Sequence, residues 1–148
     1  MCGFSGCFFL KKNSSPKHFK PISLNHRGPD DFKSFKNNFL KINFFRLKIL
    51  GGASGRQPMM SENKKFIMVF NGEIYNYIEL AHKIKRPDLI KKGDTRVLLE
   101  YISVNGLKGI KDLNGMFSIV FFDLKKKKIF LIRDRFGIKP LYYRIKKN

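Results

Sequence analysis

Four short and almost continuous runs of apolar residues constrain the fold of this chain most. Such runs are typical of strands buried on both faces, because a strand with one face in water alternates apolar and polar residues. Sheets made of these strands must be covered by other layers. The segment Asn37–Leu50 is mixed and rich in aromatic residues, and it predicts a longer strand or a bent pair. The four runs are Cys2–Leu10, Phe66–Phe70, Met116–Phe122 and Ile129–Ile132.

Two segments have the periodicity of helices. Within Ile74–Lys85, apolar residues recur every three or four positions, which gives the helix one apolar face. The segment Asp94–Ile102 predicts a second helix, with Asp94 or Thr95 as a side-chain cap at its start. Arg96 and Glu100 are four residues apart in this helix and predict an ion pair on a face other than the apolar one.

The order of these segments predicts one layered α/β (α+β) domain that spans residues 1–148. A hairpin over Gly115–Ile132 follows the two helices, and the run Lys125–Lys128 closes it as a solvated turn. With 43% hydrophobic residues, including 16 Phe, there is enough apolar material for one core. The longest apolar run falls far short of the roughly 18 residues that span a bilayer, so no membrane partner is expected.

The net charge of +20 raises the alternative of a nucleic-acid partner, because clustered Lys and Arg release counterions from phosphates. Most of the lysines are scattered along the chain, however, and the one dense run is the predicted hairpin turn. An A/T-rich coding sequence would also produce this abundance of Lys, Asn, Ile and Phe. Nucleic-acid binding is therefore disfavoured. The only two cysteines do not form a disulfide framework, so a cytoplasmic location is expected.

Cys2 directly follows the initiator methionine. If Met1 is removed, Cys2 carries a thiol and a free α-amino group, which make a nucleophile with its own base. The other polar clusters are ambiguous when each is taken alone. HRGPD and NGEIYN, which starts at Asn71, can be ordinary turns, and Asp94 can be only a helix cap.

Taken together, these motifs are far more specific. In order, the chain reads MCG, HRGPDD, FRL, GRQPM, NGEIYNY, GDT, LNGMFSIVFFD and RDRFGIKPLYY. This series resembles the N-terminal glutaminase domain of asparagine synthetases, a class II glutamine amidotransferase of the N-terminal-nucleophile hydrolase type. The resemblance covers essentially the whole chain. It implies a four-layer αββα sandwich, here without its last strands.

The resemblance also implies a reaction. Cys2 attacks the side-chain amide of glutamine, and its α-amino group, with a pKa of roughly 7.7–8.0 in model compounds, accepts the thiol proton. A thioester forms, ammonia leaves, and water then releases glutamate. The resemblance assigns the Asn71 side chain and the Gly72 backbone N–H to the oxyanion of the tetrahedral intermediate.

Three charged residues correspond to the substrate site of the resembled family. Arg46 would bind the α-carboxylate of glutamine through two parallel hydrogen bonds. Glu73 and Asp94 would bind its α-ammonium group. No metal is expected, because His18, His26 and His82 lack ligand spacing.

The sequence lacks a synthetase domain, so the chain is expected to be a C-terminally incomplete fragment or a separate subunit. Its ammonia would then serve the ATP-dependent amidation of aspartate or a related acceptor on a separate synthetase chain, and a homodimer is the other expected partner arrangement. This chain needs no cofactor of its own in that view, and ATP and Mg belong to the missing domain. Two alternatives remain open at this point: a glutamine-binding or regulatory remnant without turnover, and a basic nucleic-acid-binding protein.

Overall fold

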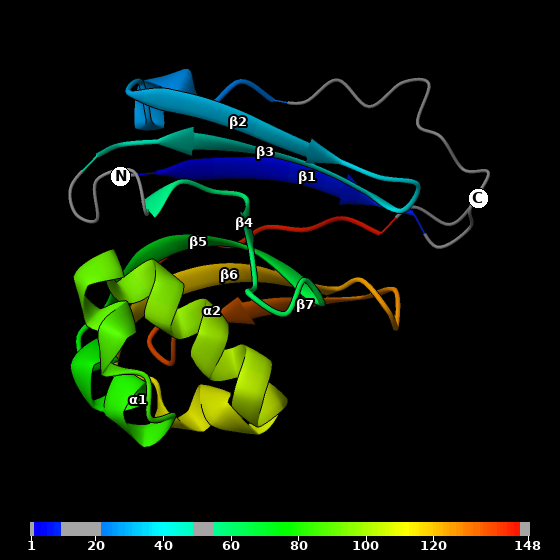
Figure 1. Ribbon diagram of the computed structural model, residues 1–148. Helices are drawn as coiled ribbons and strands as arrows, with labels where there is room; N and C mark the ends of the chain where they lie inside the picture. The colour runs from blue at the N-terminus through cyan, green and yellow to red at the C-terminus, as the bar shows by residue number, and fades with distance from the viewer. Residues whose placement is uncertain (1, 10–21, 49–54, 146–148) are drawn as a thin grey trace.

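The computed structural model describes residues 2–9, 22–48 and 55–145 of the chain. These residues form two antiparallel sheets that face each other (Figure 1). The first sheet has the order β1-β3-β2, made of β1 (Gly3–Phe8), β3 (Leu40–Arg46) and β2 (Asp31–Lys36). The second has the order β4-β5-β6-β7, made of β4 (Met59–Met60), β5 (Phe66–Ile74), β6 (Gly115–Asp123) and β7 (Lys128–Arg133).

The helical elements between β5 and β6 cover the face of the second sheet that points away from the first sheet (Figure 1). Among the helical elements whose bounds lie within the described residues, three-residue η1 lies before β2 and the others lie between β5 and β6 in the sequence. The elements are η1 (Asn25–Arg27), α1 (Tyr77–Lys83), η3 (Pro87–Lys92), α2 (Asp94–Asn105) and η4 (Gly106–Asp112).

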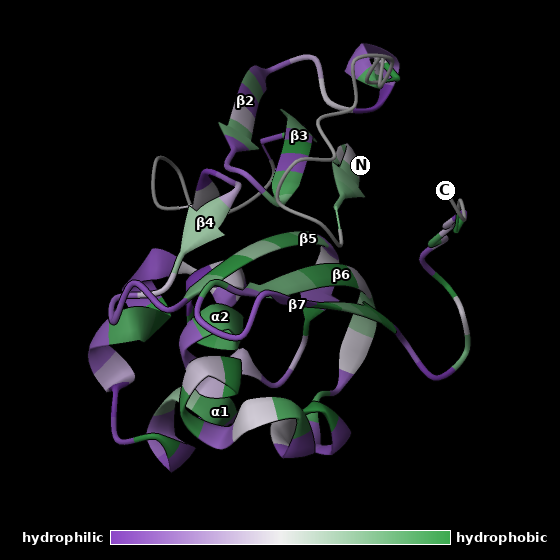
Figure 2. Cartoon of the chain, turned by 90° about the vertical axis from the view of Figure 1, so that its right-hand side faces the viewer, coloured by the Kyte–Doolittle hydropathy of each residue, from purple (hydrophilic) through white to green (hydrophobic). Residues whose placement is uncertain are grey.

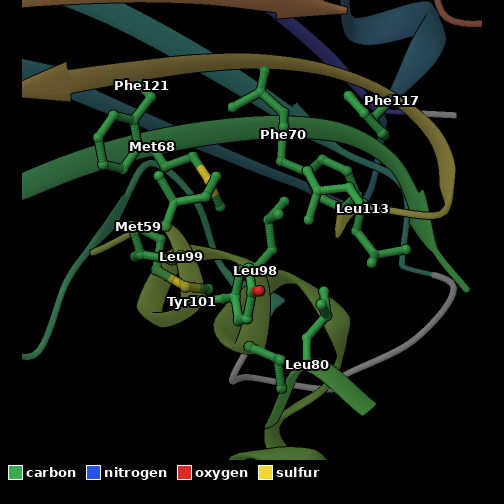
Figure 3. Packing of buried hydrophobic residues seen from close by; sticks show 14 of the residues in the cluster. Met59, Met68, Phe70, Leu80, Leu98, Leu99, Tyr101, Leu113, Phe117 and Phe121 are labelled. Carbon is green, nitrogen blue, oxygen red and sulfur yellow. The ribbon is translucent and has the colours of Figure 1, made fainter. Parts of the chain in front are cut away.

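Two apolar clusters hold these layers together. The larger one lies between the helices and the second sheet, where Met68 and Phe70 of β5 meet Leu98 of α2 (Figure 3). The smaller one lies between the sheets, where Phe44 of β3 meets Val69 of β5. Strands β5 and β6 are therefore apolar on both faces, as their hydrophobic colour in Figure 2 indicates, and this confirms the prediction of burial on both sides for these two strands. For β1 and β7 the prediction is wrong, because most of their residues are half-buried or exposed.

The predicted strands are present, but they begin or end at other residues than the sequence predicted. The predicted strand Phe66–Phe70 continues to Ile74, because β6 pairs with β5 as far as the register pair Ile74 and Gly115. Of the two alternatives for the segment Asn37–Leu50, its described residues 37–48 contain one strand rather than a bent pair. Strands β2 and β4 were not predicted. The sequence of β2, DFKSFK, is mostly exposed and lacks a continuous apolar run, and β4 has only two residues.

Both predicted helices are present, with two corrections. The first begins at Tyr77 rather than Ile74, because Asn76 turns the chain by donating to Asp112 O and accepting from Asn114 N–H. In the second, the predicted side-chain cap is wrong, since Gly93 occupies the N-cap position and no side-chain cap bond forms. The predicted ion pair is confirmed, with 3.0 Å between Arg96 Nη1 and Glu100 Oε1.

Candidate active site

A cavity of about 170 Å³ lies where the two sheets and the start of α2 come together. Since one water needs only about 10–15 Å³, this cavity has room for a small-molecule ligand. Cys2, directly before β1, lines it together with residues from β3, β5, β6 and α2 that are far apart in the sequence. All six residues singled out from the sequence are among them: Cys2, Arg46, Asn71, Gly72, Glu73 and Asp94.

Cys2 lies directly before β1, and its half-buried thiol contacts the chain just after β3. The Leu47 backbone N–H points to Cys2 Sγ over 3.4 Å, and Leu47 O lies 3.5 Å from the same sulfur. The register pair Gly3 and Phe45 explains this placement, because it brings the start of β1 beside the end of β3. Cys2 therefore lies at the edge of the inter-sheet space, close to Arg46.

Asn71 points into the space between the two sheets. Successive side chains of a strand alternate between its faces, so Asn71 shares a face with Val69, which packs between the sheets. Asn71 is 7% exposed and lines the cavity together with Cys2. This arrangement brings a side-chain amide to the same cavity as the thiol.

The backbone N–H of Gly72 points away from β6. In an antiparallel ladder, opposite residues alternate between pairs that bond each other and pairs that do not. Gly72 is opposite Phe117, whose N–H and C=O both bond Asp134 on the other side, at 3.2 and 2.9 Å. The pair is thus one of those without mutual hydrogen bonds, and Gly72 N–H points toward the β4 edge of the sheet, where the cavity lies.

A glycine is required at position 72 by the close approach of β6. A Cβ atom at this residue would lie 2.0 Å from the carbonyl oxygen of Met116 and 2.7 Å from Cα of Phe117. Both atoms belong to the backbone, so they cannot move aside as a flexible side chain would. The absence of a side chain also leaves the strand backbone open to the cavity.

Charges of both signs line the cavity. Arg46, the last residue of β3, is 4% exposed, and Lys139, from the segment after β7, is 5% exposed. Glu73 and Asp94 contribute two carboxylates from β5 and α2. Fixed cations and anions in one small cavity favour a zwitterionic ligand over a ligand of one charge.

Asp94 is held by the backbone around it. Its Oδ2 accepts a hydrogen bond from Ile74 N–H at 3.1 Å, and its Oδ1 accepts one from Thr95 N–H at 2.7 Å. Burial raises the pKa of this carboxyl, and the negative charge of Glu73 raises it as well, whereas the bonds from Ile74 and Thr95 oppose the shift. The result is a fixed carboxylate that gains from a cationic partner.

Sequence reasoning missed several residues of the cavity. Gln57 lies in the GRQPM motif and Lys139 in the RDRFGIKPLYY motif, but neither motif indicated a role for them. Their place in the cavity depends on how β4 and the segment after β7 pack, which no local pattern predicts. The other lining residues are Leu47, Gly55, Phe70, Thr95 and Met116.

A second cavity of about 220 Å³ adjoins the first at Glu73 and Asp94 and extends over Tyr75, Tyr77 and Lys91. Cys2 does not line it. Elsewhere in the described ranges, no three His, Cys, Asp or Glu side chains are grouped as metal ligands would be. Among the same residues, no helix has the length and apolar character needed to cross a membrane.

The chain is similar in sequence to several known proteins. The sequence model of the glutamine amidotransferase domain matches residues 1–148. The chain is 36% identical over 149 residues to asparagine synthetase (glutamine-hydrolyzing) 2 of Bacillus subtilis, which covers 97% of this chain and 20% of that protein. It is 34% identical to asparagine synthetase (glutamine-hydrolyzing) of Zea mays and 30% identical to asparagine synthetase (glutamine-hydrolyzing) 1 of Arabidopsis thaliana, in each case over 96% of this chain and 25% of the relative. The chain thus spans a fifth to a quarter of the length of these relatives.

Proposed function

Because the chain belongs to the family of glutamine amidotransferase domains, we propose that it hydrolyses glutamine to glutamate and ammonia, with Cys2 as the nucleophile. The observation that supports this most is the single cavity that contains Cys2, Asn71 and Gly72 beside Arg46, Glu73 and Asp94. Hydrolysis of an amino-acid amide needs these groups in one place: a thiol as nucleophile, an amide and a backbone N–H as hydrogen-bond donors, and charges of both signs to bind the substrate.

The proposed reaction begins when Met1 has been removed. The α-amino group of Cys2 takes the proton of the thiol, and the sulfur attacks the side-chain amide carbon of glutamine. The amide C=O electrons move to oxygen and form a tetrahedral oxyanion. Asn71 Nδ2 and Gly72 N–H donate hydrogen bonds to this oxyanion, which is where fixed donors lower the barrier most.

Collapse of the intermediate breaks the carbon–nitrogen bond. The leaving nitrogen takes the proton from the α-ammonium group of Cys2, so ammonia departs and a thioester to Cys2 remains. Water then attacks the thioester carbon while the α-amino group accepts one of its protons, the carbon–sulfur bond breaks, and the departing sulfur takes this proton from the α-ammonium group. The products are glutamate and the regenerated thiol.

Substrate recognition follows from the charges of the cavity. Arg46 binds the α-carboxylate of glutamine, and its planar guanidinium can make two parallel hydrogen bonds to it. Glu73 and Asp94 bind the α-ammonium group. None of these steps requires a metal ion or an organic cofactor.

The wider setting is also part of the proposal. The described residues supply two sheets and one helical layer of the four-layer αββα sandwich of N-terminal-nucleophile hydrolases, and residues 1–148 act as one glutaminase domain in the cytoplasm. The relatives are named asparagine synthetases. The released ammonia would therefore amidate aspartate or a related acceptor in an ATP- and Mg-dependent synthetase domain outside this chain, reached through a partner chain or a homodimer.

Ammonia release from glutamine tests the proposal. A purified chain whose first residue is confirmed as Cys2 should release ammonia, and the Cys2→Ala variant should release none. Cys7→Ala is the matched control, since Cys7 lies on β1, the strand that directly follows Cys2, and is also half-buried, and it should keep the activity. A folded, processed chain that binds glutamine without releasing ammonia would contradict the reaction and leave only a binding role.

A further inference from the structure

The side chain of Gln57 bonds the backbone of β5 next to the proposed oxyanion site. Its Oε1 accepts a hydrogen bond from Phe70 N–H at 2.6 Å, and its Nε2 donates one to Phe70 O at 3.1 Å. Gln57 is 4% exposed and lines the cavity with Cys2. The oxygen and the nitrogen of this side-chain amide therefore both bond the backbone of Phe70.

These two bonds extend the β4–β5 ladder beyond the end of β4. Met59 is opposite Met68 in the register, so the next position of the same kind places Gln57 opposite Phe70. Strand β4 begins only at Met59, and the primary amide of Gln57 occupies the place where a further peptide group of β4 would bond. The side chain thus closes the ladder at this end.

The next backbone groups on this edge of β5 belong to Gly72. Residues two apart on a strand direct their N–H and C=O groups to the same side, so Gly72 N–H follows Phe70 N–H along the β4 edge. Because the ladder closes at Phe70, the edge is open to the cavity at Gly72. Gln57 therefore lies at the boundary between the paired and the open part of the strand.

We propose that Gln57 is a positioning residue that fixes the two peptide groups on either side of Phe70, one through each hydrogen bond, and thereby holds Gly72 N–H toward the reacting carbonyl. The role rests on the proposed glutaminase reaction, in which that N–H stabilises the oxyanion. On the other side, Asn71 is opposite Ser118 of β6 in the register. The short stretch from Phe70 to Gly72 is then held from both edges, which keeps a donor in place before charge develops.

The chain offers a matched control at the other end of the same ladder. Ser61 is 2% exposed, and its Oγ accepts a hydrogen bond from Phe66 N–H at 3.0 Å, so a side chain closes the ladder there as well. Ser61 does not line the cavity. Loss of this bond should weaken the β4–β5 contact in a similar way without affecting Gly72.

The experiment compares Gln57→Met, Gln57→Glu and Ser61→Ala in the full chain. Methionine keeps the length of the side chain without hydrogen bonds, whereas ionised glutamate keeps the acceptor and loses the donor. Both Gln57 variants should lower kcat for glutamine hydrolysis by about 10–100-fold, since loss of a whole oxyanion donor costs about 10²–10³. KM should stay within about threefold, because the oxyanion donor acts in the transition state.

A second measurement does not depend on activity. The ¹⁵N order parameter of Gly72, about 0.85 for rigid backbone, should fall toward about 0.6 in the Gln57 variants and stay unchanged in Ser61→Ala. An unchanged Gly72 order parameter in folded Gln57 variants, or equal losses of kcat in Gln57→Met and Ser61→Ala, would overturn the positioning role. An inactive parent chain would overturn the proposed reaction instead, and the order parameters would still decide whether Gln57 fixes Gly72.

Discussion

The Asp94 carboxylate accepts a hydrogen bond from the backbone N–H of Ile74 at 3.1 Å, so the first residue of α2 is tied to the last residue of β5. The same contact places Asp94 on the wall of the cavity beside Glu73. A helix start and a strand end that are 20 residues apart in sequence thus form one anionic surface. The pH dependence of substrate binding should follow from this relationship.

Glutamine binding should weaken in acid at a pH above the usual range of an aspartate. Burial raises the pKa of Asp94, so the carboxyl takes up its proton at a higher pH than its ordinary value of 3.8. The ammonium group of glutamine requires the ionised form, and KM should therefore rise as pH falls through this raised pKa. The check is a series of KM measurements against pH in the parent chain.

The Asp94→Asn variant should have a high KM that no longer shows this rise in acid. Asp112→Asn is the control, because Asp112 lies outside the cavity and its carboxylate accepts from Tyr101 Oη at 2.6 Å. That variant should keep the pH profile of the parent chain. The same acid dependence in Asp94→Asn would show that another group controls binding.

Arg46→Lys should raise KM for glutamine by about tenfold and change kcat much less. Lysine keeps the positive charge but cannot make the two parallel bonds of a guanidinium, and a hydrogen bond to a charged group contributes about 1.5–3 kcal/mol. Arg56→Lys is a suitable control, since Arg56 is exposed and pairs with Asp31 at 3.2 Å outside the cavity. A KM for Arg46→Lys equal to that of the parent would contradict the role of Arg46.

The sequence predicted those parts of the fold that local patterns determine. The apolar runs of β5 and β6 identify strands because these residues are buried on both faces, and the Arg96–Glu100 pair follows from helical spacing. The apolar run of β7 also predicted a strand, although its residues are only half-buried or exposed. Strand β2 could not be found in this way. Its residues are mostly exposed, and it exists because β3 supplies its hydrogen-bond partners.

The residues of the cavity likewise include some that local motifs predict and others that only the tertiary structure reveals. Its six predicted residues came from motifs, and their meeting in space required the paired ends of β1 and β3 together with β5 and α2. Gln57 has no such signal, because its role depends on β4 beginning only at Met59, which leaves the Gln57 side chain to bond Phe70. Ladder ends are tertiary features, so a single sequence does not predict which side chain will close them.

Gly72→Ala should abolish glutamine hydrolysis and lower the free energy of unfolding by about 1–3 kcal/mol, the usual cost of overpacking. The added Cβ would lie 2.0 Å from Met116 O, so β5 and β6 must separate where the oxyanion donor lies. Gly106→Ala is the control, because it faces open space and has a φ of 64°, so it should lose some stability and keep the activity. Urea unfolding and ammonia release measure both effects. An active Gly72→Ala variant would contradict the backbone donor.

Asp134→Asn should lower the folding stability of the chain and make that stability less dependent on acid pH. The buried carboxylate accepts from Phe117 N–H and Lys139 N–H through Oδ2 and from Ile138 N–H through Oδ1. An asparagine has one acceptor oxygen, so its amide nitrogen would face a backbone donor, at a cost of about 1–3 kcal/mol for a buried unsatisfied group. The segment that places Lys139 in the cavity should loosen as a result.

The acid dependence of Asp134 has a definite sign. Burial alone would raise the pKa of this carboxyl, but the hydrogen bonds from Lys139, Ile138 and Phe117 outweigh it and hold the pKa below 3.8. The stability from this group is therefore present above the ordinary aspartate pKa and is lost as pH falls through the lower folded value. The urea concentration at the unfolding midpoint should decrease for the parent chain as pH falls through that window, and it should decrease less for Asp134→Asn.

Asp88→Asn is the control, since Asp88 is exposed and pairs with Arg86, so it should retain the stability of the parent more closely at neutral pH. Equal losses in both variants at neutral pH would show that Asp134 does not anchor the segment after β7.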